Sequence, residues 1–427
     1  MWLTNNKVTV IFLAIGMAVI CSAAKKLDGE LIGVQGRVAP KAELPPYGMV
    51  LVPQGNFLMG LNDQDAILAM NAPITTVSVD AFWMDQTEIT NNEYRQFVTY
   101  VYDSVSRRIL GEQFEEFLIL EDQWGNPLDP PTLNWKTNIS KRNPDYMEAI
   151  NNGLYNPPSN GFDKTLNVSK LIYTYGWVNY EVILGRAKSR NGEAPQSHIV
   201  ENVLVYPDTL VWSRDFAFAF NDPFTFRYYT HPSYDDYPVV GVNWKQAMAF
   251  SDWRTKIMAA HCSANKLTVP NDYRLPTEAE WEFAARGGLE QQMYPWGGPY
   301  TYDRQGCYLA NFQPQRARFG LDGGVRTAPT GSYKPNDYGL FDMAGNVAEW
   351  TRSAYDEQSH KFVSSLNPSY NYEVTDEDGL PMRRKVIRGG SWKDIAYFLQ
   401  CGARTFEYQD TAKSYIGFRC VRSYMGN

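Results

Sequence analysis

The chain lacks the residues from which many common metal and nucleic-acid sites are built. It has 4 His and 5 Cys, and no two cysteines have the Cys-x-x-Cys spacing. Zinc sites need such closely spaced nitrogen and sulfur ligands, so the sequence gives no indication of zinc. The formal net charge is −7, with 40 Lys and Arg against 47 Asp and Glu. Because nucleic-acid binding requires concentrated positive charge, we expect no nucleic-acid partner.

Long apolar runs are absent except near the N-terminus. The run from Val8 to Ile20 is too short to span a bilayer comfortably, but it fits the core of a signal peptide. We therefore expect residues 1–24 to be a signal peptide. Two endings stay open, because Ser22-Ala23-Ala24 suits ordinary signal peptidase and Cys21 lies where a lipoprotein cysteine is expected. Either ending predicts an exported chain in a compartment that permits disulfides.

Aromatic residues are abundant, at 14% of the chain, and accompany 32 Gly and 25 Pro. This composition is typical of a loop-rich fold in which aromatic side chains fill irregular gaps. Three helices are predicted where a capping residue precedes apolar residues at helical spacing. The caps are Thr90 with Glu93, Asn243 with Gln246, and Thr277 with Glu280.

Strand patterns and one long insertion complete the predicted organisation. Met49–Val52 and Phe57–Gly60 flank a turn and predict a β-hairpin. A polar lead occupies residues 25–47, and we expect one α+β domain over residues 48–425. Within it, residues 105–235 lack a clean helical period, which predicts an insertion carrying a function or a partner surface.

A series of motifs in the same order resembles the formylglycine-generating enzyme (sulfatase-modifying factor) family. That resemblance implies a single loop-rich α+β domain related to C-type lectins, here with a long insertion. It also implies an oxidase that binds copper(I) through two reactive cysteines. The motifs are Met49–Gly60, Trp83–Tyr94, Pro238–Trp253, Tyr273–Gly288, Tyr294–Gly298, Gly339–Trp350 and Arg388–Cys420.

The sequence departs from that family where the chemistry would occur. In the family the reactive cysteines follow the Gly-Gly-Ser-aromatic turn, but the corresponding loop, Lys393–Gln400, contains none. Copper(I) prefers soft thiolate ligands, so we expect no copper and no catalytic residue. Cys401 and Cys420 match cysteines that are structural in the family, and their usual partners are absent. We expect these two to form a disulfide, although spacing alone does not decide it.

The resemblance also implies structural calcium, which takes six to eight oxygen ligands in flexible loops. The first expected set is the Asn311 and Asp322 side chains with the Phe312 and Gly324 carbonyls. The second set uses the Asp342 and Glu349 side chains with the carbonyls of Met343, Gly345 and Val347. The alternative interpretation is that these are turn residues whose side chains bond to their own backbone.

A narrower resemblance covers nearly the whole chain and includes the insertion. Gly29–Val34, Tyr47–Met49, Glu88–Val98 and Tyr206–Thr209 are similar to the PorK/GldK lipoproteins of type IX secretion and gliding machinery. This implies a non-catalytic structural subunit of a ring on the periplasmic face of the outer membrane. A lipid on Cys21, self-association in the ring and a PorN/GldN-like partner are implied with it. The alternatives are an exported oxidase that uses other residues, and a lectin-like ligand-binding module.

Overall fold

The computed structural model describes residues 45–61, 72–122, 124–157, 164–178, 183, 197–216, 227–315, 324–371, 374 and 378–426. Cys21, the predicted signal peptide and the lead up to residue 44 lie outside the described residues. Residues Pro45–Tyr424 form one compact unit. None of the helices in the described ranges is both long and apolar enough to cross a bilayer.

The three predicted helices are confirmed, each with the predicted cap. Thr90, Asn243 and Thr277 each accept a hydrogen bond from the backbone of the third helical residue in a capping box. Within the described residues, two further α-helices lie in the insertion. The α-helices are α2 (Asn91–Gly111), α3 (Pro144–Leu154), α5 (Val211–Asp215), α7 (Trp244–Ala264) and α8 (Glu278–Arg286), and the short 3₁₀ turns are η1 (Glu115–Phe117), η2 (Val168–Lys170), η3 (Pro232–Tyr234), η4 (Ser359–Lys361), η5 (Leu380–Arg383) and η6 (Ala396–Leu399).

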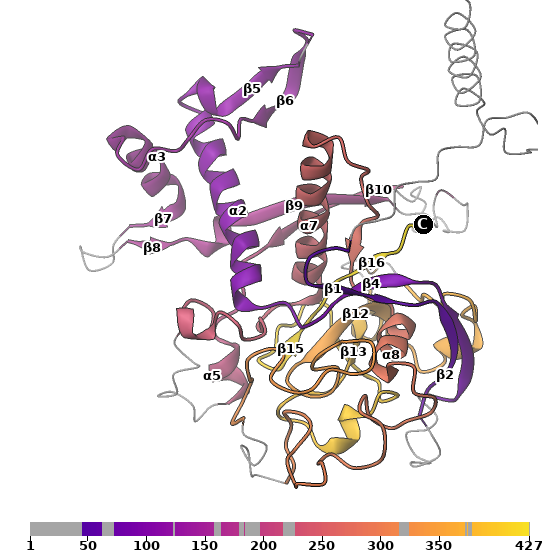
Figure 1. Ribbon diagram of the computed structural model, residues 1–427. Helices are drawn as coiled ribbons and strands as arrows, with labels where there is room; N and C mark the ends of the chain where they lie inside the picture. Colours follow the sequence, from indigo (N-terminus) through magenta and orange to yellow (C-terminus); the bar gives the residue numbers. More distant parts are fainter. Residues whose placement is uncertain are drawn as a thin grey trace, which may run out of the picture. The chain divides into compact units, whose positions relative to one another are not determined.

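Strands of the described part form two four-stranded sheets and four two-stranded ones (Figure 1). The first large sheet has the order β1-β4-β16-β11 and is antiparallel; the second has the order β14-β13-β12-β15, with β12 and β15 parallel. The two-stranded sheets are β2-β3, β5-β6, β7-β8 and β9-β10. The strands are β1 (Met49–Val52), β2 (Gly55–Met59), β3 (Thr75–Val79), β4 (Phe82–Asp85), β5 (Leu118–Glu121), β6 (Pro127–Leu133), β7 (Tyr155–Asn156), β8 (Thr165–Leu166), β9 (Ile172–Val178), β10 (His198–Leu204), β11 (Tyr273–Arg274), β12 (Ala348–Ala354), β13 (Arg384–Arg388), β14 (Thr405–Tyr408), β15 (Ile416–Gly417) and β16 (Val421–Ser423).

The predicted hairpin between Met49–Val52 and Phe57–Gly60 is wrong. Strand β1 pairs with β4, and β2 pairs with β3, so the two segments belong to different sheets. Gly55 packs against the Phe283 ring, where an added Cβ would lie 2.9 Å from the ring's Cζ. The chain therefore leaves β1 to pack on helix α8 instead of folding back.

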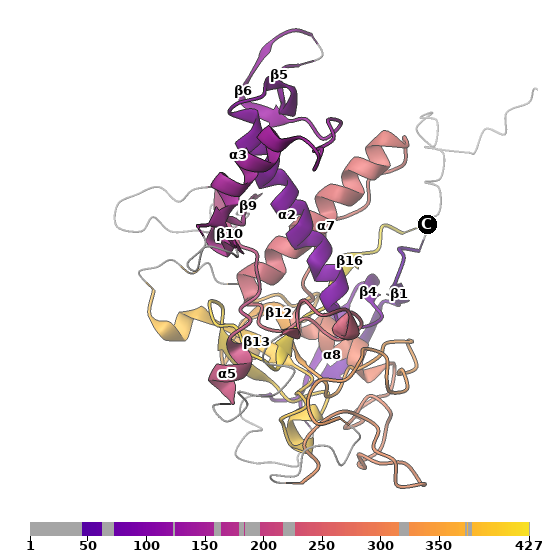
Figure 2. The same cartoon turned by 90° about the vertical axis from the view of Figure 1, so that its left-hand side faces the viewer.

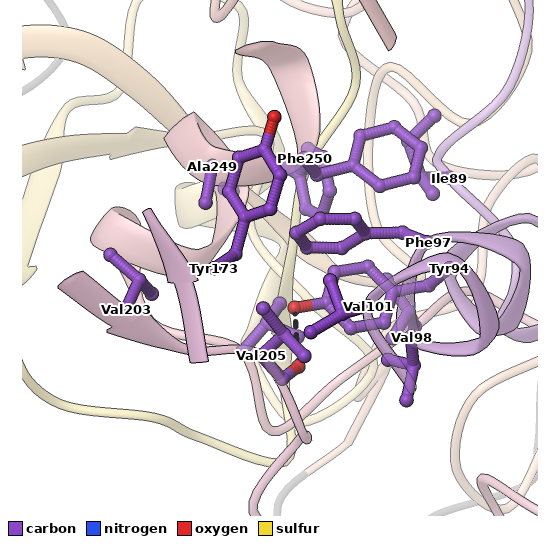
Figure 3. Packing of buried hydrophobic residues seen from close by; sticks show 14 of the residues in the cluster. Ile89, Tyr94, Phe97, Val98, Val101, Tyr173, Val203, Val205, Ala249 and Phe250 are labelled. Carbon is purple, nitrogen blue, oxygen red and sulfur yellow. Dashed lines mark hydrogen bonds between the residues drawn. The ribbon is translucent and has the colours of Figure 1, made fainter. Parts of the chain in front are cut away.

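The insertion shares its hydrophobic core with helices α2 and α7, which lie side by side (Figures 1 and 2). Figure 3 shows Tyr94 and Phe97 of α2 against Phe250 of α7 and Tyr173 of β9. The Tyr94 ring stacks on Phe250 with centroids 5.7 Å apart. Its hydroxyl donates to the Val205 carbonyl at 2.9 Å, so this buried polar group is satisfied by the insertion itself.

Candidate functional site

The Gly-Gly-Ser turn directly follows strand β13. Gly389 and Gly390 have φ angles of +89° and +68°, a backbone conformation that glycine adopts without steric cost. A Cβ on Gly390 would lie 2.8 Å from the Phe398 carbonyl oxygen, so space also requires glycine there. The Ser391 hydroxyl then donates to Asp394 Oδ2 at 2.6 Å. The loop Lys393–Gln400 therefore starts from a closely defined turn.

Side chains of this loop are charged, aromatic or aliphatic, except for the amide of Gln400. Lys393 Nζ lies 3.4 Å from the centroid of the Tyr415 ring, and Asp394 is held by Ser391. Residues Ala396–Leu399 of the loop form η6, in which Leu399 is buried. The loop contributes no sulfur ligand, because its sequence contains no cysteine.

The predicted disulfide between Cys401 and Cys420 is not formed, and both residues are free thiols. Cys401 packs in the core cluster around Trp281, whereas Cys420 packs in the cluster around Phe250. Burial raises the pKa of each thiol to about 12. Because the thiolate is the reactive form and the metal ligand, neither residue is suited to oxidation chemistry or copper binding at neutral pH.

Helix α5 of the insertion covers the residue that follows the Gly-Gly-Ser turn. Trp392 is 3% exposed. Its ring stacks on Trp212 at 5.9 Å and contacts Phe216 at 5.1 Å. Asp215 at the end of α5 accepts hydrogen bonds from the Ser414 amide and hydroxyl, at 2.9 and 2.7 Å. The insertion is thus held beside this loop by aromatic packing on Trp392 and by the partly buried carboxylate of Asp215.

A network of buried ion pairs holds the other side of the turn. Arg388 donates to Glu282 of α8, and it also donates to the Ala403 carbonyl at 2.8 Å. Glu282 is 0% exposed and also accepts from Arg286 Nη2 at 2.6 Å. Arg404 pairs with both carboxylate oxygens of Glu278, at 2.7 and 2.9 Å. The network fixes β13 to α8 beneath the loop.

Beside this network lies a cavity of about 260 Å³, lined by the ion pairs on one side and by Thr75–Val77 and Ser364–Ser365 on the other. A larger cavity of about 410 Å³ lies elsewhere, with Trp296 and Tyr333 in its wall. Neither cavity includes a residue of the loop Lys393–Gln400 that would carry the oxidase chemistry.

The first expected calcium set is only partly within the described residues, since Asp322 lies outside them. Asn311 is fully buried, and its Nδ2 donates to the Arg326 carbonyl at 2.7 Å. Its Oδ1 has no hydrogen-bond partner. Gly324 lies beside that oxygen, because a Cβ on Gly324 would be 2.8 Å from it. A buried carbonyl oxygen without a donor fits a cation ligand, and Phe312 follows directly in the chain.

The second expected calcium set forms the turn that leads into β12, but its glutamate is already engaged. Glu349 accepts from Arg419 Nη2 at 2.6 Å and from Trp281 Nε1 at 2.7 Å. Asp342 Oδ2 accepts from the Gly331 amide at 2.6 Å. Gly345, with φ of +83°, is tied to the Gly-Gly-Ser turn by a bond from its amide to the Gly389 carbonyl. Met343 and Val347 are buried in the same turn. Glu349 does not fit as a ligand while Arg419 neutralises it.

Sequence reasoning missed Glu88, which lies beside this second set. Glu88 is 0% exposed, accepts from Asn346 Nδ2 at 3.1 Å, and has no partner for Oε2. Burial and the nearby Asp342 carboxylate raise its pKa, and burial raises the pKa of Asp342 to about 6. The only sequence signal that pointed to Glu88 was its position at the start of the Glu88–Val98 motif. Among the residues that the structure describes, no three acidic, His or Cys side chains converge on one metal position.

Comparison with known proteins gives consistent matches along the chain. The family model described as "Sulfatase-modifying factor enzyme 1-like domain" matches residues 34–424. The formylglycine-generating enzyme of Bos taurus is 26% identical over 411 residues, covering 95% of this chain and 82% of that protein. The "Inactive C-alpha-formylglycine-generating enzyme 2" of Bos taurus is 35% identical over 193 residues, covering 44% of this chain and 50% of that protein.

The chain is also similar to a bacterial relative and, more distantly, to a solved structure. The formylglycine-generating enzyme of Thermomonospora curvata is 34% identical over 190 residues, covering 44% of this chain and 55% of that protein. The solved structure of PvdO from Pseudomonas aeruginosa has a TM-score of 0.46 and 18% identity, over 88% of this chain and 94% of that one. The family match confirms the predicted fold class, a loop-rich α+β domain of the formylglycine-generating-enzyme type.

Proposed function

Because the chain belongs to the family of sulfatase-modifying factor enzyme 1-like domains, we propose that it is a non-catalytic member that serves as a structural subunit. The observation that carries this proposal is the loop after the Gly-Gly-Ser turn. The loop lacks cysteine, and its neighbour Trp392 is buried under helix α5. Loss of activity has a precedent in the family, since one relative is named an inactive enzyme.

Thiol chemistry elsewhere in the chain offers no replacement within the described residues. Cys262, Cys401 and Cys420 are buried, and Cys307 is the exposed one. A copper(I) site needs thiolates that approach one another, whereas Cys401 and Cys420 belong to different core clusters. This arrangement supports a scaffold role over the exported oxidase.

The finer form of the proposal is a subunit of the type IX secretion ring at the periplasmic face of the outer membrane. It is supported by the sequence resemblance to the PorK/GldK lipoproteins, which includes the insertion. Cys21 would carry the lipid, and a PorN/GldN-like protein would be the partner. One acyl chain binds membranes weakly, so a ring of many copies would supply the anchoring through multivalency.

Two measurements test the proposal. We expect the membrane-extracted native protein to purify as a ring with a PorN/GldN-like chain, visible by electron microscopy and identified by mass spectrometry. A soluble monomer with no stable partner would overturn the ring. We also expect no copper(I) binding in competition with a chromogenic chelator beyond the weak contribution of Cys307, for which Cys307→Ser is the control. Stoichiometric tight binding in Cys307→Ser would restore the oxidase.

A ligand-binding module is the second candidate. The cavity of about 410 Å³ favours it, because Trp296 and Tyr333 accompany Glu290 and Asp337 in its wall. Aromatic faces combined with carboxylates are suited to sugars and to amines. A reproducible rise in melting temperature with one member of a glycan or amine panel, lost in Trp296→Ala, would support this function.

A further inference from the structure

The β5–β6 hairpin of the insertion contacts helix α2 and the turn η1 at its base. Its strands pair from Leu118 opposite Leu133 to Glu121 opposite Pro127. Buried Phe117 anchors its base, where the Asn134 amide donates to the Phe117 carbonyl at 2.8 Å. Figures 1 and 2 both show the hairpin extending past the C-terminal end of α2.

Apolar side chains on this hairpin are exposed on both faces. Ile119 and Leu120 are 41% and 43% exposed, and neighbouring residues of a strand point to opposite faces. Trp124 at the turn is 77% exposed. A two-stranded hairpin is marginally stable by itself, and clustered exposed apolar groups on a soluble domain mark interaction surfaces. The exposed residues therefore need a function other than folding.

Asp122 accepts hydrogen bonds from two residues of the turn that carries Trp124. Asp122 Oδ1 accepts from the Trp124 amide at 2.8 Å and from the Asn126 amide at 2.9 Å. Asp122 Oδ2 accepts from Asn126 Nδ2 at 3.0 Å. These bonds shape the backbone of the turn, and tryptophan is among the residues enriched at the energetic centres of interfaces.

Strand addition is disfavoured on one edge of the hairpin. Strand β6 has the sequence PLDPPTL, and each proline lacks the amide hydrogen that a pairing strand needs. The hairpin is thus adapted to recognition through side chains, with Trp124 as the leading group.

The charge around the hairpin indicates what kind of surface it meets. All charged residues between Leu110 and Trp135 are acidic, and the chain as a whole carries −7. Glu115 and Glu121 are exposed beside the apolar residues. Such a surface repels nucleic acid and anionic membranes, and it also repels a second copy of this acidic chain.

We infer that the β5–β6 hairpin is the docking element for a different protein, whose surface has an apolar hollow for Trp124 bordered by Lys and Arg. The inference rests on the proposed scaffold function, because a scaffold requires a partner. It identifies the surface through which the insertion contacts that partner.

The test is site-specific photo-crosslinking in cells of the source organism. Benzoylphenylalanine replaces Trp124 in the full-length chain, and the same group at Leu380, which is 64% exposed, is the control position. We expect an adduct from position 124 to one protein of different sequence, with the crosslinked peptide next to Lys or Arg. The adduct should fall at least tenfold in Glu115→Lys/Glu121→Lys. It should return when the partner's basic residues are replaced by Glu.

Three results would overturn the inference: an adduct to a second copy of this chain, an adduct to lipid, or no adduct above that at position 380. Trp124→Ala separates this inference from the proposed ring. If the ring assembles normally with Trp124→Ala, the scaffold function is supported, but the hairpin is not one of the contacts that hold the ring together. If a charge-dependent adduct forms but no ring is found, the docking role of the hairpin is supported and the proposed ring is contradicted.

Discussion

Replacing Glu282 by Gln tests whether the buried ion pairs hold the Gly-Gly-Ser turn on helix α8. Glu282 is 0% exposed and lies between two guanidinium groups, those of Arg286 and Arg388. It also accepts the Gly60 amide at 2.8 Å. Glutamine keeps the shape and one acceptor, but it removes the negative charge between the two cations and leaves Arg388 only the more distant Glu278 carboxylate, at 3.6 Å.

The expected cost follows from burial. Removing one partner of a buried ion pair costs about 3–5 kcal/mol, because the remaining charge is left uncompensated in a medium of low polarity. A whole domain is stable by about 5–15 kcal/mol. Glu282→Gln should therefore remove a large share of the stability at pH 7.

Asp410→Asn is the matched control. Asp410 also has two basic partners, with its Oδ1 3.2 Å from Lys245 Nζ and its Oδ2 3.7 Å from an Arg383 nitrogen, but its side chain is 43% exposed. Solvent screens such pairs, so the control should lose less than about 1 kcal/mol. Equilibrium urea unfolding, followed by tryptophan fluorescence at pH 7, compares the two variants with the parent.

The pH dependence adds a second readout. The positive charges of Arg388 and Arg286 outweigh the effect of burial and hold the pKa of Glu282 below its ordinary 4.5. The folded state therefore binds this proton more weakly than the unfolded chain does. The contribution of the Glu282 carboxylate to the free energy of unfolding is complete above the pKa of the unfolded chain. It is lost as pH falls through the pKa of the folded state. Equal losses in Glu282→Gln and Asp410→Asn, with unchanged acid sensitivity, would refute the reasoning.

Two further predictions concern other parts of the molecule. Lys385 is 3% exposed over the Trp244 ring, and burial lowers its pKa from 10.5 to about 8. Because the unfolded chain binds this proton more tightly, the parent should gain stability relative to Lys385→Met between pH 8 and 10, by up to about 3 kcal/mol. Millimolar calcium should raise the parent's melting temperature, and Asn311→Ala should abolish this response. Asn336→Ala, which removes a buried amide bonded to the Ala284 carbonyl, should lower stability but retain the response.

Local signals predicted the helices well, and the misses have identifiable causes. The capping boxes at Thr90, Asn243 and Thr277 fix helix starts through bonds within one turn of chain, so a single sequence contains them. Helix α3 also had a local signal, Asn143 followed by Pro144, but the polar stretch around it obscured the pattern. Strand pairing depends on contacts distant in sequence, which is why the β1–β2 hairpin was predicted wrongly.

At the candidate site, too, features within one continuous segment could be predicted from the sequence, whereas contacts between distant segments could not. The cysteine-free loop could be predicted because it follows a Gly-Gly-Ser turn within one continuous segment. Glu88 could not, because only the fold brings it to Asn346, 258 residues away along the chain. The Cys401–Cys420 disulfide failed for a related reason. Nearness in sequence suggested pairing, but the two thiols pack in different core clusters.

The insertion and the residue after the Gly-Gly-Ser turn pack together. Trp392 is buried against Trp212 and Phe216, and Asp215 bonds to Ser414 on the neighbouring segment. Burying a tryptophan contributes about 2–3 kcal/mol, so the covered state is stabilised by the same contacts that close the loop. In the proposed scaffold, the insertion thus covers Trp392 with helix α5 and presents an exposed element at the β5–β6 hairpin.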